Sequence, residues 1–130
     1  MEEEKMDACK KIIDQITAEG AYENNQMFNM NIWDWSQGVA LYGVWKYYQA
    51  TGDKSYLLWL ENWFEKHFEG FPQKENINTM AQYLTLTCIY EHTGNKVYGE
   101  YCEKAAKWLI TELPRTGNVR FPACYHRQPE

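Results

Sequence analysis

Three observations predict an all-α fold made of helical hairpins for this chain of 130 residues. Apolar residues recur at the spacing of an α-helix along most of the sequence, and no segment alternates apolar and polar residues as a half-buried strand does. A unit of two helices also repeats at a fixed offset. The loops that join one unit to the next are longer than the turns within a unit. These features together predict stacked helical hairpins, arranged as an open solenoid or as a closed toroid of concentric helices.

The first two predicted helices flank a long polar loop. Apolar residues at helical spacing mark a first helix that Gly20 ends, and an Asn-rich connection covers residues 21–34. A second helix is predicted from about Trp35 to Ala50. The core-facing positions expected in these two helices are Met6, Cys9, Ile12, Ile13, Ile16, Val39, Tyr42, Trp45 and Tyr48.

Three further helices follow. Asp53 is placed to cap a third helix, which Gly70, Phe71 and Pro72 break. A fourth helix is predicted to start near Asn78, and a fifth to end at Pro114. Their expected core-facing positions are Tyr56, Leu57, Leu60, Phe64, His67, Ala81, Leu84, Cys88, Ile89, Tyr98, Tyr101, Ala105, Trp108 and Leu109.

The repeat is visible as matching residues 42 positions apart. The first copy contains Tyr48, Thr51, Gly52, Lys54, Tyr56 and Glu61, and the second contains Tyr90, Thr93, Gly94, Lys96, Tyr98 and Glu103. Gly52 and Gly94 can adopt the left-handed conformation that ends a helix, and Asp53 and Asn95 can cap the next one. In a toroid the long loops between such units would gather at one end, above the mouth of the inner helices.

Composition and charge argue against several classes of function. The net charge is −5 and the basic residues are scattered, so the chain lacks the basic stripe of a nucleic-acid-binding protein. No apolar run approaches the roughly 20 residues of a membrane-spanning helix. The acidic start Glu2-Glu3-Glu4 does not fit a signal peptide, so we expect a cytoplasmic protein. Six tryptophans are hard to bury in one small domain, so several are expected to line a groove or to need cover from further protein.

Metal and disulfide sites are not predicted. The four cysteines are widely spaced without a C-x-x-C pair, and the three histidines are isolated. These residues are Cys9, Cys88, Cys102 and Cys124, with His67, His92 and His126. Three of the cysteines fall on predicted helix faces beside apolar residues, where a free thiol behaves as a small hydrophobic group.

Tryptophan and asparagine gather in the long loops, where a toroid would place the mouth of a cleft. Trp33, Asp34 and Trp35 lead into the second helix, and Asn76 and Asn78 lead into the fourth. A sugar ring offers a flat apolar face to an indole and a rim of hydroxyls to polar side chains. The sequence therefore makes carbohydrate the first ligand class to consider.

Several of these residues also have structural interpretations. We expect Trp33 and Trp45 to pack in the core and Gln37 to hydrogen-bond the loop backbone. Three polar residues at helix starts can equally serve as N-caps, namely Asp34, Asn76 and Asn78.

Five segments along residues 30–116 read, in order, W-D-W-S-Q-G-V-A-L-Y-G-V-W-K, Y-Y-Q-A-T-G-D, N-I-N-T-M, L-T-L-x-x-x-Y-E-x-T-G-N and L-P-R-T. In order and spacing they resemble glycoside hydrolases that remove unsaturated uronic acids, namely the unsaturated rhamnogalacturonyl hydrolases of family 105 and the unsaturated glucuronyl hydrolases of family 88. The resemblance implies a six-hairpin (α/α) barrel, of which residues 1–130 would be the N-terminal part of a single domain.

The resemblance also implies the reaction. Such enzymes hydrate the C4–C5 double bond of a terminal unsaturated uronic acid on a pectin-derived oligosaccharide, and the hydrated product rearranges and releases the neighbouring sugar. No metal or organic cofactor takes part. Hydration requires a carboxyl group that gives and then accepts a proton.

The family's acid/base residue is an aspartate in a W-x-D motif that follows a G-G-F-x-H loop. The corresponding stretch here is 117–123, where Ala123 takes the place of the histidine, and the sequence reaches Glu130 before any W-x-D. The resemblance therefore assigns no catalytic residue to this chain. It does carry over Trp35 as a sugar-stacking residue and Asn78 at a position where members place an aspartate. Because an amide accepts no proton at neutral pH, Asn78 is expected to orient substrate.

Two other classes stay open. The chain fits a catalytically inactive relative that retains carbohydrate binding, and it fits a short helical-repeat module that grips a peptide in its groove. A partial toroid would also expose apolar helix faces at its edges, which favours self-association.

Overall fold

The computed structural model describes residues 1–70 and 75–113, and all the regular structure in these ranges is helical. The elements are α1 (Glu2–Thr17), α2 (Trp35–Thr51), α3 (Lys54–Phe68), the short 3₁₀ helix η1 (Ile77–Met80), α4 (Gln82–Thr93) and α5 (Lys96–Thr111). The five predicted helices are confirmed. The fourth differs at its start, because a 3₁₀ turn over Asn78 precedes the α-helix that begins at Gln82. The expected breaks at 71–72 and Pro114, together with Cys124, His126 and the 117–123 stretch, lie outside the described residues.

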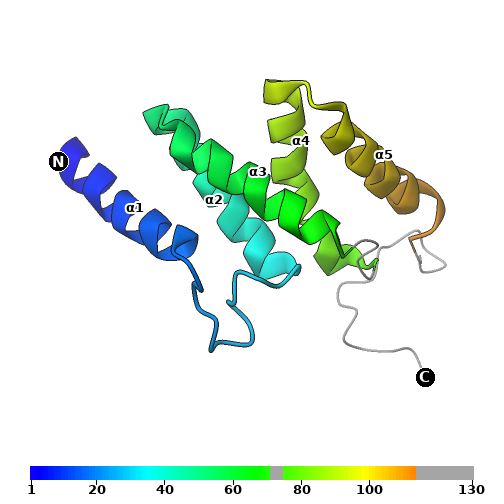
Figure 1. Ribbon diagram of the computed structural model, residues 1–130, viewed down its shortest axis with the longest axis horizontal. Helices are drawn as coiled ribbons and strands as arrows, with labels where there is room; N and C mark the ends of the chain where they lie inside the picture. Colours follow the sequence, from blue (N-terminus) through cyan, green and yellow to red (C-terminus); the bar gives the residue numbers. More distant parts are fainter. Residues whose placement is uncertain (71–74, 114–130) are drawn as a thin grey trace.

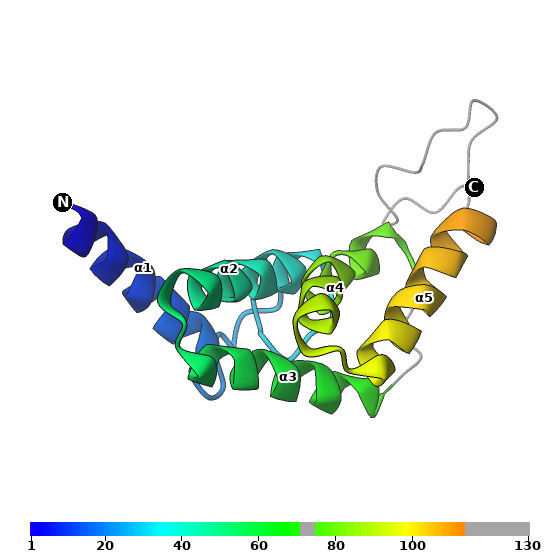
Figure 2. The same cartoon turned by 90° about the horizontal axis from the view of Figure 1, so that it is seen from above.

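The helices form two successive hairpins with α1 packed beside the first (Figure 1). The main contacts join α2 to α4, α2 to α3 and α4 to α5, whereas α1 packs on α2. The short turns from α2 to α3 and from α4 to α5 lie at the upper end in Figure 1. The ends of α1 and α3 and the starts of α2 and η1 lie at the opposite end, as the sequence predicted for a toroid. Seen from above, α2 and α4 lie on one side of the molecule and α3 on the other (Figure 2).

The two copies of the sequence repeat make the same turn. Gly52 and Gly94 have φ angles of 70° and 69°, and their N–H groups donate to the carbonyls of Tyr48 and Tyr90. The carboxylate of Asp53 then accepts from the N–H of Ser55 at 3.0 Å, and the Asn95 amide oxygen accepts from the N–H of Val97 at the same distance. A left-handed glycine followed by an N-cap therefore closes one helix and starts the next in both hairpins.

The core-facing residues were predicted correctly for α3 and α5 but only in part for α2 and α4, where Trp45, Tyr48 and Ile89 are buried as predicted. In α3 and α5 the buried positions include Tyr56, Leu60, Phe64, Tyr98, Ala105 and Trp108. In α2, by contrast, Val39 is 65% exposed, and in α4 Leu84 is 56% exposed. The buried faces of α2 and α4 consist of Gln37, Gly38, Leu41, Val44, Trp45, Tyr48, Gln82, Thr85, Leu86 and Ile89.

The reason for this error is that α2 contacts three helices and α4 contacts two, besides η1. A helix covered on several sides buries small and polar side chains as well, and its apolar residues no longer mark one face. The prediction for the first helix fails for the opposite reason. Because α1 packs chiefly on α2, only Ile13 of its predicted stripe is buried, and Met6 and Ile12 are exposed.

Within the described ranges, no helix is both long enough and apolar enough to cross a membrane.

Candidate functional site

The N-terminal ends of α2 and α4 lie directly against each other. A Cβ atom added to Gly38 would lie 2.5 Å from the Cβ of Ala81 and 2.9 Å from its carbonyl carbon, so no larger residue fits without displacing the backbone. The side-chain amide of Gln82 donates a hydrogen bond to the carbonyl of Asp34. These contacts join the starts of the two helices into one end of the molecule, which we call the α2/α4 mouth.

Trp33 connects the two loops that lead into this mouth. Its indole Nε1 donates to the carbonyl of Thr79 at 2.8 Å, and its ring stacks on Trp63 with 5.6 Å between centroids. The edge of Tyr83 lies at the same centroid distance. Trp33 is buried, as is Trp45 in the middle of α2, so the prediction that both are packing residues is confirmed.

The loop before α2 is held by side chains from the first turn of that helix. The amide nitrogen of Gln37 donates to the carbonyls of Met27 and Asn29 at 2.8 and 2.9 Å. The hydroxyl of Ser36 donates to the same Met27 carbonyl at 2.7 Å. The predicted backbone-binding role of Gln37 is therefore confirmed, and the side chain is buried.

Two of the polar residues at the mouth act as helix caps. The carboxylate of Asp34 accepts from the N–H of Trp35 at 2.7 Å, at the start of α2. The side-chain oxygen of Asn76 accepts from the N–H groups of Asn78 and Thr79, and the Thr79 hydroxyl accepts in return from the N–H of Asn76 at 3.1 Å. This reciprocal pair is a capping box. The cap interpretation is confirmed for Asp34 and Asn76, whose side-chain oxygens are occupied by backbone donors.

Trp35 and Asn78 also lie at the mouth, and their side chains are available to a ligand. Trp35 is 45% exposed, and Asn78 is half-buried. Within the described ranges, neither the Trp35 indole nor the Asn78 amide takes part in a side-chain hydrogen bond or ring contact. The structure therefore places both predicted ligand residues at the same end of the molecule. By contrast, Trp33 and Asn76 lie close to them in the sequence but use their side chains in packing and in capping a helix.

The titratable groups with shifted pKa values have structural causes. The pKa of the Asp14 carboxyl is lowered by hydrogen bonds from Lys10 and Tyr56, and that of Asp53 by the hydroxyl and N–H of Ser55. A lowered pKa keeps a carboxyl ionised, which does not suit a proton donor near neutral pH. Burial raises the pKa of the Cys88 and Cys102 thiols, so neither is an activated nucleophile. Among the described residues, no three His, Cys, Asp or Glu side chains lie close enough together to hold a metal ion.

Known proteins share the sequence and the fold of this chain. Residues 6–128 match the family model described as Glycosyl Hydrolase Family 88. Over 85 residues the chain is 34% identical to the unsaturated rhamnogalacturonyl hydrolase YesR of Bacillus subtilis (strain 168), a match that covers 65% of this chain and 25% of that protein.

Two crystal structures, each of a possible member of the GH105 family, share the fold at 30% identity. The structure from Salmonella enterica subsp. enterica serovar Paratyphi A str. ATCC 9150 matches with a TM-score of 0.77 over 89% of this chain and 35% of its own. The structure from Klebsiella pneumoniae subsp. pneumoniae MGH 78578 matches with a TM-score of 0.74 over 88% of this chain and 34% of its own. The chain thus spans about a quarter of its curated relative and a third of the solved ones. It belongs to glycosyl hydrolase family 88, and its helices form part of an (α/α)6 barrel.

Proposed function

We propose that this chain supplies sugar-binding residues of a glycoside hydrolase that acts on oligosaccharides ending in an unsaturated uronic acid. The reaction is hydration of the C4–C5 double bond, after which the product rearranges and releases the neighbouring sugar. The uronide-degrading activity in the name of the Bacillus relative supports this assignment. The observation that carries it is the exposed Trp35 ring at the α2/α4 mouth, where Trp33 is buried and the side chains of Asp34 and Asn76 cap helices.

In this proposal Trp35 stacks on the apolar face of the terminal sugar and Asn78 hydrogen-bonds its polar rim. An amide donates and accepts hydrogen bonds but carries no transferable proton near neutral pH, so Asn78 orients the substrate. The family's acid/base residue is an aspartate in a W-x-D motif, and residues 1–130 contain no such motif. We therefore expect the 130-residue chain to bind the oligosaccharide without turning it over.

The test uses an unsaturated galacturonyl-rhamnose disaccharide with the purified chain. We expect quenching of tryptophan fluorescence and a constant ultraviolet absorbance of the double bond. Trp35→Ala and Asn78→Ala should each weaken binding by about 5- to 30-fold, because stacking and buried polar contacts contribute on the order of 1–2 kcal/mol. Gln49→Ala, at the exposed far end of α2, is the control and should bind normally.

Each alternative outcome has a definite meaning. Loss of the double-bond absorbance would show that the chain contains its own acid/base residue and would overturn our site assignment. Binding without turnover, by this chain and by a longer form of the protein, would identify a catalytically inactive binder. If pectin-derived sugars do not bind at all, the helical-repeat interaction module becomes the better interpretation.

We also propose that residues 1–130 belong to a single barrel domain and that the isolated chain self-associates through the exposed sides of α2 and α4. Val39 and Leu84 are large apolar residues that no described helix covers. Burial of such surface favours association. Sedimentation velocity should show oligomers for the wild-type chain and monomers for a Val39→Glu, Leu84→Glu double variant. A strictly monomeric wild-type chain at high concentration would contradict the proposal.

The proposal includes a cytoplasmic location. Cys9, Cys88 and Cys102 are free thiols, which suits a reducing compartment. Recovery of the protein in an extracellular or periplasmic fraction would contradict it.

A further inference from the structure

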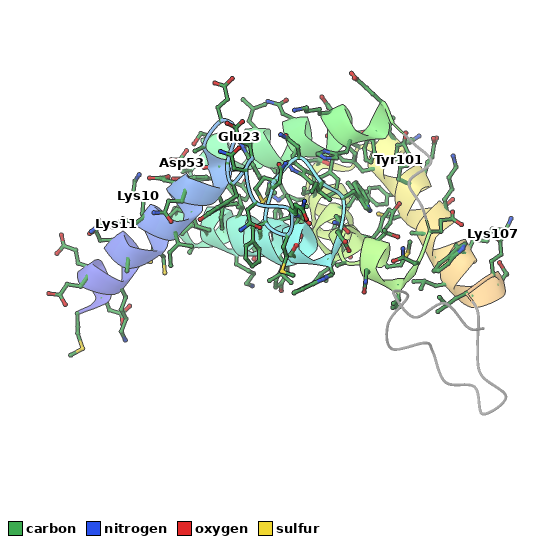
Figure 3. The ribbon with its side chains drawn as sticks, turned by 90° about the horizontal axis from the view of Figure 1, so that it is seen from below. Lys10, Lys11, Glu23, Asp53, Tyr101 and Lys107 are labelled. Carbon is green, nitrogen blue, oxygen red and sulfur yellow. The ribbon has the colours of Figure 1, made fainter. Side chains whose placement is uncertain are left out.

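A pocket lies away from the α2/α4 mouth, between the end of α1, the loop that follows it and one side of α3. Its volume is about 320 Å³, at the lower end of the range of roughly 300–1,000 Å³ for small-molecule sites. The side chains that matter for its chemistry are Glu19, Asn31, Trp59, Asn62, Trp63 and Lys66. Figure 3 shows the loop that carries Glu23 lying between α1 and α3. Neither Trp35 nor Asn78 lines this pocket.

The wall formed by the loop is fixed to α3. The buried Trp63 donates from its indole Nε1 to the carbonyl of Met30 at 2.7 Å. The ring of His67 stacks on Trp63 with 3.8 Å between centroids, and its Nε2 lies 2.9 Å from the carbonyl of Asn31. Two side chains of one helix thus hold consecutive loop residues. The pocket is therefore preformed, which lowers the entropic cost of binding a ligand.

Trp59 gives this pocket an available aromatic surface. Four of the six tryptophans are buried, namely Trp33, Trp45, Trp63 and Trp108. Trp59 is half-buried, and among the described residues its ring has no aromatic partner and its indole N–H donates no hydrogen bond. It lies four residues before Trp63, so both rings project from the same side of α3. An open indole in a pocket is a suitable platform for the apolar face of a sugar ring.

The polar groups around Trp59 include both amides and a cation. Asn31 and Asn62 offer donors and acceptors to sugar hydroxyls. The ammonium of Lys66 donates to the side-chain oxygen of Asn31 at 3.3 Å, and no described carboxylate forms an ion pair with it. Its positive charge is therefore available to a ligand carboxylate. Glu19, on the α1 side, can accept from a hydroxyl of the same ring.

We propose that this pocket binds a uronic acid, with Trp59 under the ring, Asn31 and Asn62 at its hydroxyls and Lys66 at its carboxylate. It would be a carbohydrate site additional to the one at Trp35 and Asn78. The proposal does not depend on the hydrolytic function, because it requires neither a double bond nor a proton donor.

The test is a titration of the chain with galacturonic acid, with galactose as the neutral counterpart, followed by two-dimensional NMR. Galacturonic acid should shift the indole and amide signals of Trp59, Asn62 and Lys66. Trp59→Ala and Asn62→Ala should each weaken binding at least fivefold. Trp35→Ala should leave these shifts unchanged, which separates the two sites.

The charge at Lys66 is tested separately. Lys66→Gln keeps a hydrogen-bond donor beside Asn31 and removes the positive charge, so it should weaken galacturonic acid binding and leave galactose binding unchanged. Equal affinity of the wild-type pocket for the two sugars would overturn the assignment of the carboxylate. The site itself would be overturned if galacturonic acid caused no shift of signals in the pocket. It would also be overturned if the shifts persisted in Trp59→Ala and Asn62→Ala but vanished in Trp35→Ala.

Discussion

The indole nitrogen of Trp33 and the carbonyl of Thr79 lie 2.8 Å apart although 46 positions separate them in the sequence. This hydrogen bond joins the loop before α2 to the 3₁₀ turn before α4. Both groups are buried, so no water replaces either partner. The bond fixes the relative position of the two helix starts and thereby presents Trp35, two residues further on, at the α2/α4 mouth.

We expect Trp33→Phe to destabilise the fold by about 1–3 kcal/mol, because the Thr79 carbonyl would remain buried without its donor. A phenyl ring keeps part of the aromatic packing, and the loss of the smaller pyrrole ring adds to the cost of the lost donor. Urea unfolding followed by circular dichroism measures the effect. Trp35→Phe is the matched control and should change stability by less than about 0.5 kcal/mol, since Trp35 is at the surface. Similar losses in both variants would contradict the role of the bond.

Gly38→Ala should destabilise the chain by about 1–3 kcal/mol, because the added methyl overlaps Ala81 where the starts of α2 and α4 touch. Gly43 provides an internal control in the same helix. A Cβ there meets no atom within 4 Å, so Gly43→Ala should stabilise by roughly 0.5–1 kcal/mol through the higher helix propensity of alanine. Thermal unfolding of the two variants should shift in opposite directions. A Gly38→Ala protein as stable as the wild type would show that the two helices can separate at this point.

The two hairpin turns should respond equally to loss of their caps. Asp53→Ala and Asn95→Ala each remove the acceptor for one N–H group at a helix start, at a cost of about 1 kcal/mol. Asp53→Asn and Asn95→Asp keep an acceptor and should recover most of the stability. Chemical unfolding of all four variants tests this equivalence. A large difference between the two alanine variants would show that the two turns, although alike in sequence, do not contribute equally to stability.

The pH dependence of stability should report the hydrogen bond from the Tyr56 hydroxyl to Asp14, which measures 2.8 Å. This bond raises the pKa of Tyr56 from 10.0 to about 12. The folded state then binds the tyrosine proton more tightly, so the stabilisation is complete below pH 10 and disappears as the pH approaches 12. The pKa of Asp14 is lowered from 3.8, first by Lys10 and then by Tyr56. That contribution is present above pH 3.8 and is lost as the pH falls through the lowered value.

The stability difference between the wild type and Tyr56→Phe should therefore be largest across the neutral range. It should shrink toward both extremes of pH. Melting temperatures measured from pH 3 to 11.5 test this, within the region where both proteins still fold. A difference that stays constant with pH would exclude the ionised Asp14 as the partner of the hydroxyl.

Local sequence was sufficient to predict the two hairpin turns. Among the described residues, the hydrogen bonds of Gly52 and Asp53, like those of Gly94 and Asn95, reach only residues within four positions. Such turns depend on the conformational freedom of glycine and on the reach of a short polar side chain. The predicted faces of α2 and α4 were only partly correct, because burial there depends on neighbouring helices that the periodicity of one helix does not encode. Val39 is exposed and Gln82 is fully buried for this reason.

The sequence by itself determined the helices, their caps, the repeat and the family, because these depend on residue identity at short or fixed spacing. Tertiary structure decided which aromatic and polar residues remain available to a ligand. Trp33 and Trp35 stand two positions apart in the same motif, yet one is buried against Trp63 and Tyr83 and the other is exposed. Trp59 received no functional interpretation from sequence, because its pocket forms only where α1, its loop and α3 meet. Burial is a property of the packed assembly, and the side chains left uncovered are the ones that can bind a sugar.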